Sequence, residues 1–342
     1  MHRCSGKGRN KIFRAIYMLQ KIMEYAVILL VVITSNFLLI HYMPGEPLVH
    51  ILGEEEYYDL LYRYPEQLEE VKNAYGLAEP LAKQYASYLG NMVTLQFGTS
   101  FISKQSVFSV VASHLQRTLI LVVPAILISG ILGLIAGAYA GWKPNSKMNR
   151  IFSVLSMLLY TVPAYCVAII LLVVFSFQSG WFPVGGIRSG LTTGMGNVAD
   201  IIWHMVLPVS VLVLYRTVYN FFIVKSSMGG IKKEDYILTA YGKGLCEKDV
   251  IYSHGLRNAV LPYITVVCLQ FGHMAAGTML LEVVFSWNGM GTLIYHSVMA
   301  KDIPVLQGSF ILLSVCIMAF SFLADLLYAV FDPRVRGNCE HG

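Results

Sequence analysis

Histidines are the first candidates for chemistry in this sequence, because imidazole binds metals and transfers protons. The chain has nine, and four of them fall in or near apolar stretches: His41, His204, His273 and His296. No two histidines stand four residues apart, the spacing that brings two ring nitrogens to one metal on a helix. Structural histidines with satisfied hydrogen bonds are therefore the favoured interpretation, and no metal site is predicted.

Charged residues inside long apolar stretches form the second group of candidates. Placing a charge in lipid is costly, so such a residue is a functional candidate by default. Arg216 lies deep in its stretch, where it either lines a pathway for a solute or pairs structurally. Glu282 and Asp325 lie nearer the ends of theirs, from where they could reach water or headgroups. Arg216 and Glu282 are retained as possible pathway residues.

Motifs for enzymatic chemistry are absent from the sequence. It contains no G-x-x-x-x-G-K-[ST] loop, no H-E-x-x-H and no G-x-S-x-G. The six cysteines form no C-x-x-C pair, which argues against structural zinc. No catalytic residue is predicted, and the chain is not expected to be an enzyme.

The elements that must position these residues are membrane spans. The chain of 342 residues is 56% hydrophobic and only 13% charged, with a mean hydropathy of +0.60. A soluble domain carries roughly 25% charged residues. Six stretches meet the length and apolarity of a span: 25–43, 118–141, 151–178, 201–224, 262–285 and 305–330. The first is interpreted as an uncleaved anchor, because its apolar run exceeds that of a signal peptide.

Charge bias predicts the orientation of these spans. Residues 1–21 contain six basic and no acidic residues, and 142–150 contains three basic and none acidic. Segment 225–261 carries six basic and four acidic residues, whereas 44–117 carries five basic and nine acidic. Because positive loops stay inside, both termini are predicted to be cytoplasmic and 44–117 to be outside. Apolar residues at helical spacing within 54–93 predict short amphipathic helices in that outer segment.

The predicted class is therefore an all-α polytopic membrane protein with six transmembrane helices. Its parts are a basic N-terminus (1–24), a first span (25–43), an extracytoplasmic helical segment (44–117), a core with five spans (118–331) and a cytoplasmic tail (332–342). Inside the second span, Gly133, Gly137 and Gly141 repeat every four residues, and such small residues let helices pack closely in lipid.

The inner segment 225–261 has a pattern of its own. Residues 234–242 are predicted to form one short helix, which Gly242 and Gly244 then end. Gly244 is expected to make the bend, because glycine adopts φ > 0 without a Cβ clash.

A second helix is predicted directly after this bend. Glu247 and Asp249 would lie in its first turn, where negative charge suits the helix dipole. Pro262 is expected to open the fifth span, where its missing N–H costs little. Two short helices bent at a glycine form an element that can insert into a groove on a partner protein.

This segment resembles the cytoplasmic EAA loop of ABC importer permeases of the oligopeptide, dipeptide and nickel family. That family shows D-Y-x-x-T-A-x-x-K-G-L followed by H-x-L-R-N-A-x-L-P, which this chain matches at 235–245 and 254–262. The similarity continues through E-V-V-F-S-W-N-G-M-G at 282–291 and D-I-P-V-L-Q-G at 302–308. With the MPGEP stretch at 43–47 it covers nearly the whole chain from residue 25, and it is closest to the B-type subunit.

The chain departs from the family pattern at a few positions. Tyr241 and Gly242 replace the usual Arg-Ala of the loop, Cys246 stands where a serine helix cap is common, and Asn288 replaces a proline.

The resemblance implies a function and a set of partners. The chain would be the permease of a binding-protein-dependent importer, in a bacterial or archaeal cytoplasmic membrane. Its partners would be a C-type permease, two cytoplasmic ATPases that bind ATP and magnesium, an external solute-binding protein and membrane lipid. No cofactor of its own and no nucleic acid are implied. The implied ATPase-coupling residues are Asp235, Tyr236, Ala240, Gly244, Glu247, Asp249, His254, Arg257, Asn258 and Pro262.

Two alternatives stay open at this point. Di- and oligopeptides are the cargo that the family most often implies, but nickel or metal–chelate complexes use the same permease type. An ATP-independent channel or secondary transporter is the runner-up from another class. A secondary transporter often shows internal repeats and broken helices at mid-membrane, and the sequence shows no such repeat.

Overall fold

The computed structural model describes residues 6–42, 46–74, 77, 79–190, 195–272 and 274–331. Within these ranges the chain is helical apart from loops and one isolated bridge between Thr99 and Ser106, so the all-α prediction is confirmed. The start of the MPGEP stretch, His273 and the tail 332–342 lie outside the described residues.

The chain divides into two compact units. Unit 1 comprises Met1–Arg14, Leu119–Asn288 and Ala319–Gly342, and unit 2 comprises Ala15–Thr118 and Gly289–Met318. Three long helices contribute residues to both units: α1 (Gly6–Tyr42), α6 (Val107–Trp142) and α15 (Ile303–Phe331).

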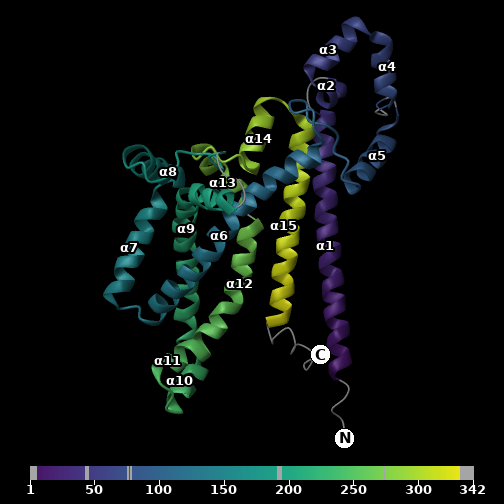
Figure 1. Cartoon of the computed structure of the whole chain (residues 1–342). Coiled ribbons are helices and arrows are strands. Elements are labelled where there is room, and N and C mark those ends of the chain that lie inside the picture. Colours follow the sequence, from purple (N-terminus) through teal and green to yellow (C-terminus); the bar gives the residue numbers. More distant parts are fainter. Residues whose placement is uncertain are drawn as a thin grey trace. The chain divides into compact units, whose positions relative to one another are not determined.

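Unit 2 contains most of α1 and the helices of the 44–117 segment (Figure 1). Its helices are α1 (Gly6–Tyr42), α2 (Pro47–Leu52), α3 (Glu54–Arg63), α4 (Pro65–Ala74), α5 (Leu81–Val93) and α14 (Met290–Met299). The short helices predicted within 54–93 are thus present. Leu48, Tyr57 and Leu68 form a small core among α2, α3 and α4. Lys301 donates to Glu54 at 2.6 Å, and this contact raises the pKa of Lys301.

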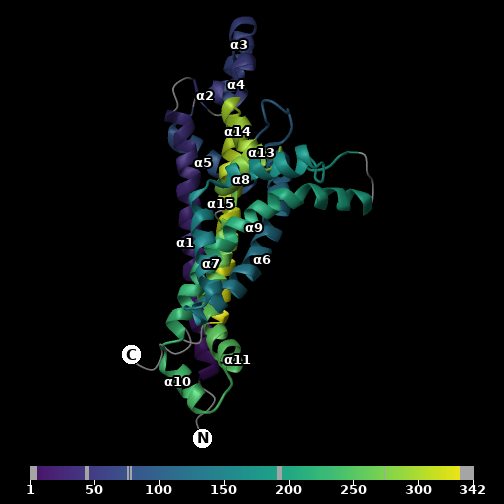
Figure 2. The same ribbon diagram turned by 90° about the vertical axis from the view of Figure 1, so that its left-hand side faces the viewer.

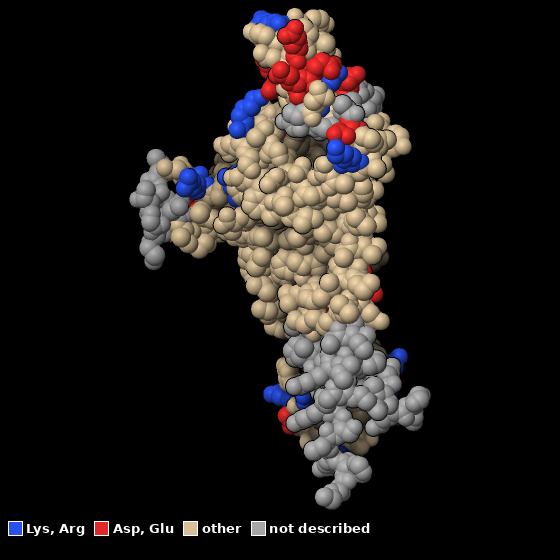
Figure 3. Space-filling view, turned by 90° about the vertical axis from the view of Figure 1, so that its right-hand side faces the viewer, with Lys and Arg blue, Asp and Glu red and all other residues tan. Residues whose placement is uncertain are grey.

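A larger apolar cluster in unit 2 joins α1 and α5 to α6, α14 and α15. It is built from Ile33, Met92, Val107, Met290 and Val305, among others. On its other flank α1 exposes large aliphatic side chains, including Ile22, Val27 and Val31. Figure 3 shows this flank with almost only uncharged side chains, while acidic side chains gather over the short helices. Such an apolar flank is typical of a helix that faces lipid.

Unit 1 contains most of the predicted core 118–331, whereas residues 289–318 of that core belong to unit 2. Its elements are α7 (Lys147–Thr161), α8 (Ala164–Leu171), η1 (Leu172–Gln178), α9 (Met195–Ile231), α10 (Asp235–Gly242), α11 (Glu247–Asp249), η2 (Val250–Leu256), α12 (Arg257–Gly272) and α13 (Met274–Val284), where η marks π-helices. The largest cluster packs α6, α8, α9 and α13 around Ile126, Val211 and Trp287.

Glycines bring α6 against α9 within unit 1. A Cβ on Gly137 would lie 2.7 Å from Cβ of Val224 and 2.8 Å from the carbonyl oxygen of Phe221. One on Gly141 would lie 2.6 Å from the carbonyl oxygen of Lys225. Only residues without a side chain allow this approach, so the predicted packing role of these glycines is confirmed.

Four described helices are long and apolar enough to cross a bilayer: Met18–Leu39, Val107–Trp142, Val198–Ile231 and Ile303–Leu326. The predicted span 151–178 is not one straight helix, because α7 and the segment Ala164–Gln178 meet at 96°. Pro163 stands between them, and a proline disfavours helical backbone at the residue before it. Counting this bent pair gives five spans. The predicted span 262–285 falls on α12 and α13, which meet at the undescribed residue 273.

Candidate functional site

The segment predicted to couple to a partner forms a helix, a bend and a second helix. The first helix, α10, runs from Asp235 to Gly242, as expected. Gly244 follows with φ +77°, which confirms it as the residue of the bend. A Cβ there would meet no heavy atom within 4 Å, so the backbone angle alone requires glycine. Figures 1 and 2 both show α10 and α11 together at one end of unit 1, next to α12.

The second helix differs from its prediction at its far end. It begins at Glu247 as expected, with Cys246 as its N-cap residue. It does not stop before the span, because a π-helical turn, Val250–Leu256, carries it directly into α12. Pro262 therefore lies inside α12, and the expectation that it opens the span is wrong. Helices tolerate an internal proline next to such π-turns, where the regular bond ladder is already interrupted.

One face of this element is anchored in the core of unit 1. Ile237 and Ala240 of α10 and Val250 of η2 are buried. They pack in one cluster with Trp142 of α6 and Met228 of α9. A displacement of α10 would therefore disturb side chains on the long helices α6 and α9, since close-packed interiors transmit strain.

Outside its buried face, the element exposes apolar side chains. Leu238 is 65% exposed, and the aromatic rings of Tyr236 and Tyr241 are 39% and 40% exposed. Leu245 beyond the bend is also exposed. Leu238 and Tyr241 are three residues apart and so share one side of α10, and exposed apolar side chains of this kind are typical of a surface that another protein covers.

Polar contacts tie the two helices together across the bend. Asn258 Nδ2 donates to the hydroxyl of Tyr236 at 3.0 Å and to the carbonyl oxygen of His254 at 3.0 Å. Cys246 Sγ lies 3.0 Å from Asp249 Oδ2, and Glu247 lies 3.9 Å from Lys143 at the end of α6. The structure thus brings together most of the predicted coupling residues. Asp235 and Arg257 are also in this element and are exposed.

Arg216 is partly buried and reaches from α9 to α12. Its Nη1 lies 3.4 Å from Oε1 of Gln270, and Gln270 Nε2 donates to Oδ1 of Asn220 at 2.6 Å. Asn220 is fully buried and Gln270 nearly so. Sequence reasoning missed these two amides. The signal was present, because Asn220 follows Arg216 by one helical turn on an otherwise apolar stretch.

Glu282 lies elsewhere in unit 1 and is fully buried. The expectation that it could reach water or headgroups is therefore wrong in this chain. Thr278 Oγ1 donates to it at 3.3 Å within α13. A buried carboxylate held in this way is a packed polar group of the fold. Asp325 on α15 is partly exposed.

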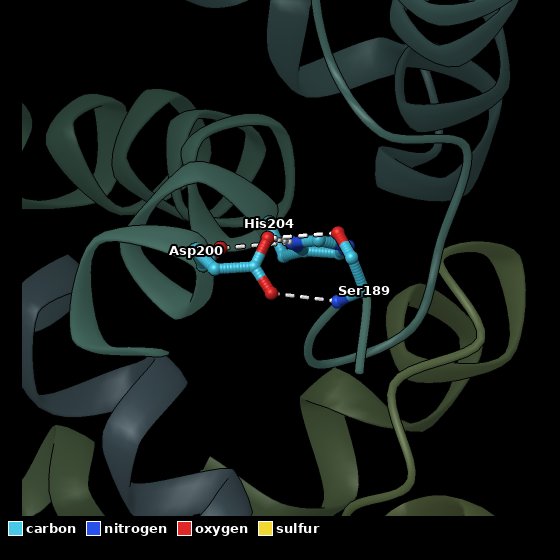
Figure 4. Close-up of polar contacts among 3 residues, drawn as sticks. All are labelled: Ser189, Asp200 and His204. Carbon is cyan, nitrogen blue, oxygen red and sulfur yellow. Dashed lines mark hydrogen bonds and ion pairs between the residues drawn. The ribbon is translucent and has the colours of Figure 1, made fainter. Parts of the chain in front are cut away.

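Asp200, His204 and Ser189 form a separate polar cluster near the start of α9 (Figure 4). Asp200 accepts hydrogen bonds from the backbone N–H of Ser189 at 2.7 Å and from its hydroxyl at 2.8 Å. His204 Nδ1 lies 2.8 Å from the carbonyl oxygen of Asp200. The serine hydroxyl is bonded to the carboxylate and not to the histidine, so this is not the arrangement of a serine hydrolase. The hydrogen bonds between Ser189 and Asp200 instead hold the loop before α9 against that helix.

His41 on α1 also has structural partners. His41 Nε2 lies 3.0 Å from Oε1 of Gln84, and its ring packs on Phe37. Across the described parts of the chain, no group of three or more His, Cys, Asp or Glu residues is placed to hold a metal ion.

The long apolar helices define the class of this chain as a multi-pass membrane protein. Residues 130–337 match the family described as binding-protein-dependent transport system inner membrane components, and 14–122 match the N-terminal region of such membrane components. The chain belongs to this family.

Curated relatives align with nearly the whole chain. The di/tripeptide transport system permease protein of Pseudomonas aeruginosa is 31% identical, covering 88% of this chain and 93% of its own. The oligopeptide transport system permease protein of Bacillus subtilis is 31% identical, with 94% and 99% covered. The glutathione transport system permease protein of Escherichia coli is also 31% identical, with 94% and 98% covered.

Proposed function

We propose that this chain is the membrane-spanning subunit of an ATP-driven importer that moves di- or oligopeptides across a bacterial cytoplasmic membrane. The observation that carries the proposal is the two-sided element 235–258. Its buried face packs with Trp142 and Met228, and its exposed face offers Leu238 and Tyr241. A groove on a moving ATPase that binds the exposed face could shift the long helices through the buried face.

The proposed complex contains a second, C-type permease, two ATPases that bind ATP and magnesium, and an external solute-binding protein. The relatives' names support peptides as cargo, because they describe di/tripeptide, oligopeptide and glutathione systems. In this arrangement the chain has six spans, with both termini and the 225–261 segment in the cytoplasm. The sixth span comes from reading α12 and α13 as one crossing.

The experiment compares the permease pair with and without its ATPases in proteoliposomes. ATP hydrolysis and peptide uptake are expected only when the ATPases are present, with uptake also requiring the binding protein. Robust hydrolysis by this chain alone would contradict the proposal. Uptake driven by an ion gradient without ATP would favour a secondary transporter. Uptake of a nickel–chelate complex in place of peptide would support an ATP-driven importer but with a different cargo.

A further inference from the structure

An open groove of about 800 Å³ runs between α9 and α12 in unit 1, with α7 forming one rim. Its lining is apolar and aromatic and includes Tyr160, Tyr219, Ile223, Tyr263 and Val266. Such walls accept apolar groups, as ligand sites in proteins commonly do.

The two main walls of this groove are matched antiparallel stripes. On α9 the lining residues Ser226, Ile223 and Tyr219 are spaced by three and four, which places them on one helix face. On α12 the lining residues Ala259, Tyr263 and Val266 follow the same spacing.

Both stripes continue by one turn beyond the groove to polar residues. Arg216 precedes Tyr219 by three residues, and Gln270 follows Val266 by four. The contact of 3.4 Å between Arg216 and Gln270 joins the two helices at this point. One helical turn beyond the groove, the two stripes therefore meet at the guanidinium group of Arg216.

The guanidinium group lacks a countercharge. In the described part of unit 1, Arg216 forms no ion pair with a carboxylate, and its one side-chain hydrogen bond there is to the neutral Gln270. Guanidinium has five N–H donors, so one contact leaves most of them available. Asn220 holds Gln270 in place and is itself fully buried, with an Nδ2 that makes no hydrogen bond there. A guanidinium group held by a side-chain amide, one turn beyond an apolar groove, can bind the carboxylate of an amphipathic ligand.

We propose that Arg216 binds the C-terminal carboxylate of the translocating peptide, while the groove between α9 and α12 accepts its apolar side chains. The inference rests on the proposed peptide cargo. Gln270 and Asn220 act as positioning residues, because Gln270 accepts from the guanidinium group and Asn220 holds Gln270. The ligand class is therefore a short peptide with a free C-terminus and an apolar residue near it.

The test uses the complete importer in proteoliposomes and pairs of radiolabelled tripeptides that end in a free carboxylate or an amide. Calorimetry first selects the pairs in which the solute-binding protein binds the acid and the amide with equal affinity. Arg216→Gln is expected to lower uptake of the free acid on the order of tenfold or more, the loss of a charged hydrogen bond. Uptake of the amide is expected to stay unchanged. Arg150→Gln, an exposed arginine at the start of α7, is the matched control and should change neither.

Gln270→Glu provides a second variant with almost the same shape. It would place a carboxylate beside Arg216 and neutralise it, so the preference for the free acid should be lost while the helices stay packed. A cysteine in place of Ser226 gives a readout that does not need transport. Free-acid peptide is expected to slow its maleimide labelling in the solubilised complex, and the Arg216→Gln background should abolish that protection.

Several outcomes would overturn the inference. If Arg216→Gln lowers uptake of the acid and of the amide equally, Arg216 has a structural role and does not bind the carboxylate. A co-purified anionic lipid that protects the Ser226→Cys site, with no effect of peptide, would assign the groove to lipid. These results leave wild-type peptide uptake intact and so spare the proposed function. Absence of all peptide uptake by the wild-type importer would instead remove the peptide cargo and, with it, this ligand.

Discussion

The side-chain amide of Asn258 donates a hydrogen bond to the hydroxyl of Tyr236 at 3.0 Å, although 22 residues separate them. This bond links α10 to the start of α12 across the bend at Gly244. It is the one described side-chain hydrogen bond that joins these two helices directly. A force applied to α10 therefore reaches α12 through this contact and through the apolar cluster beneath it.

Tyr236→Phe removes the acceptor of this bond and keeps the ring. The loss is expected to cost about 0.5–1.5 kcal/mol of local stability. Transport per ATP hydrolysed should fall by a few-fold, while membrane levels stay normal. The ratio of uptake to phosphate release in proteoliposomes measures this. Tyr241→Phe, on the same exposed helix, is the matched control, and an equal effect of both changes would show that the bond has no coupling role.

Gly244→Val forces a β-branched residue into φ +77°. The strain is expected to be on the order of 1–3 kcal/mol, enough to displace α10 without unfolding the spans. Transport and ATPase association should both be lost, as measured by uptake and co-purification.

Two further variants distinguish backbone strain at Gly244 from steric crowding by an added side chain. Gly244→Asn should keep most activity, because asparagine tolerates the left-handed region. Gly242→Ala should be silent, since a Cβ there meets nothing within 4 Å and φ is ordinary. Wild-type transport by Gly244→Val would make 225–261 a tolerant surface loop.

Much of the coupling element could be predicted because glycine and charge act locally. Gly244 needs φ > 0 whatever surrounds it, and the helix before it follows from its pattern. The π-turn 250–256 could not be predicted, because it depends on how Val250 packs against other helices. For the same reason Pro262 was misread as a helix start. Pro163, in contrast, is a local signal from which the 96° break could have been predicted.

The two possible pathway residues differ in their surroundings because of tertiary packing. Arg216 and Glu282 are both single charges in apolar stretches, and their positions in those stretches predict that Arg216 lies deeper and that Glu282 reaches water or headgroups. Only the fold buries Glu282 completely and turns Arg216 toward Gln270. Burial depends on which helix lies opposite, and local spacing does not carry that information.

Reversing the charge at the start of α11 tests the electrostatics of the second helix. Replacing Glu247 and Asp249 with Lys opposes the helix dipole and is expected to cost about 0.3–1 kcal/mol each. It also removes the contact of Glu247 with Lys143. ATPase docking should weaken, as shown by a higher dissociation constant in detergent. Lys248→Glu, in the same turn, adds an acid where the dipole favours it and should leave docking unchanged or tighter.

Accessibility labelling tests the orientation of the two charged segments. In a background without native cysteines, single cysteines replace Gln67 on α4 and Lys248 on α11, both of which are exposed. Removing Cys246 is essential, because it is exposed two residues from Lys248. An impermeant maleimide should label position 67 in intact cells and position 248 only after lysis. The reverse pattern would invert the proposed topology.

Gly137→Ala tests the close approach of α6 to α9. The new Cβ would lie 2.7 Å from Cβ of Val224 and 2.8 Å from the carbonyl oxygen of Phe221, so a helix must shift. Overpacking of this kind costs roughly 1–3 kcal/mol, and the melting temperature of the purified chain in detergent should fall by several degrees. Gly229→Ala on α9 is the matched control, because its Cβ would meet nothing within 4 Å.

A second-site change then identifies the atoms in conflict. Shortening Val224 to Ala removes its two methyl groups but leaves its Cβ, and the backbone carbonyl of Phe221 stays in place. Because these are the atoms that the alanine at 137 would meet, the double variant Gly137→Ala with Val224→Ala should remain as unstable as the single one. Full rescue by Val224→Ala would mean that the methyl groups, and not the close backbone approach, set the need for glycine. The melting temperatures of the four proteins in this cycle decide between the two.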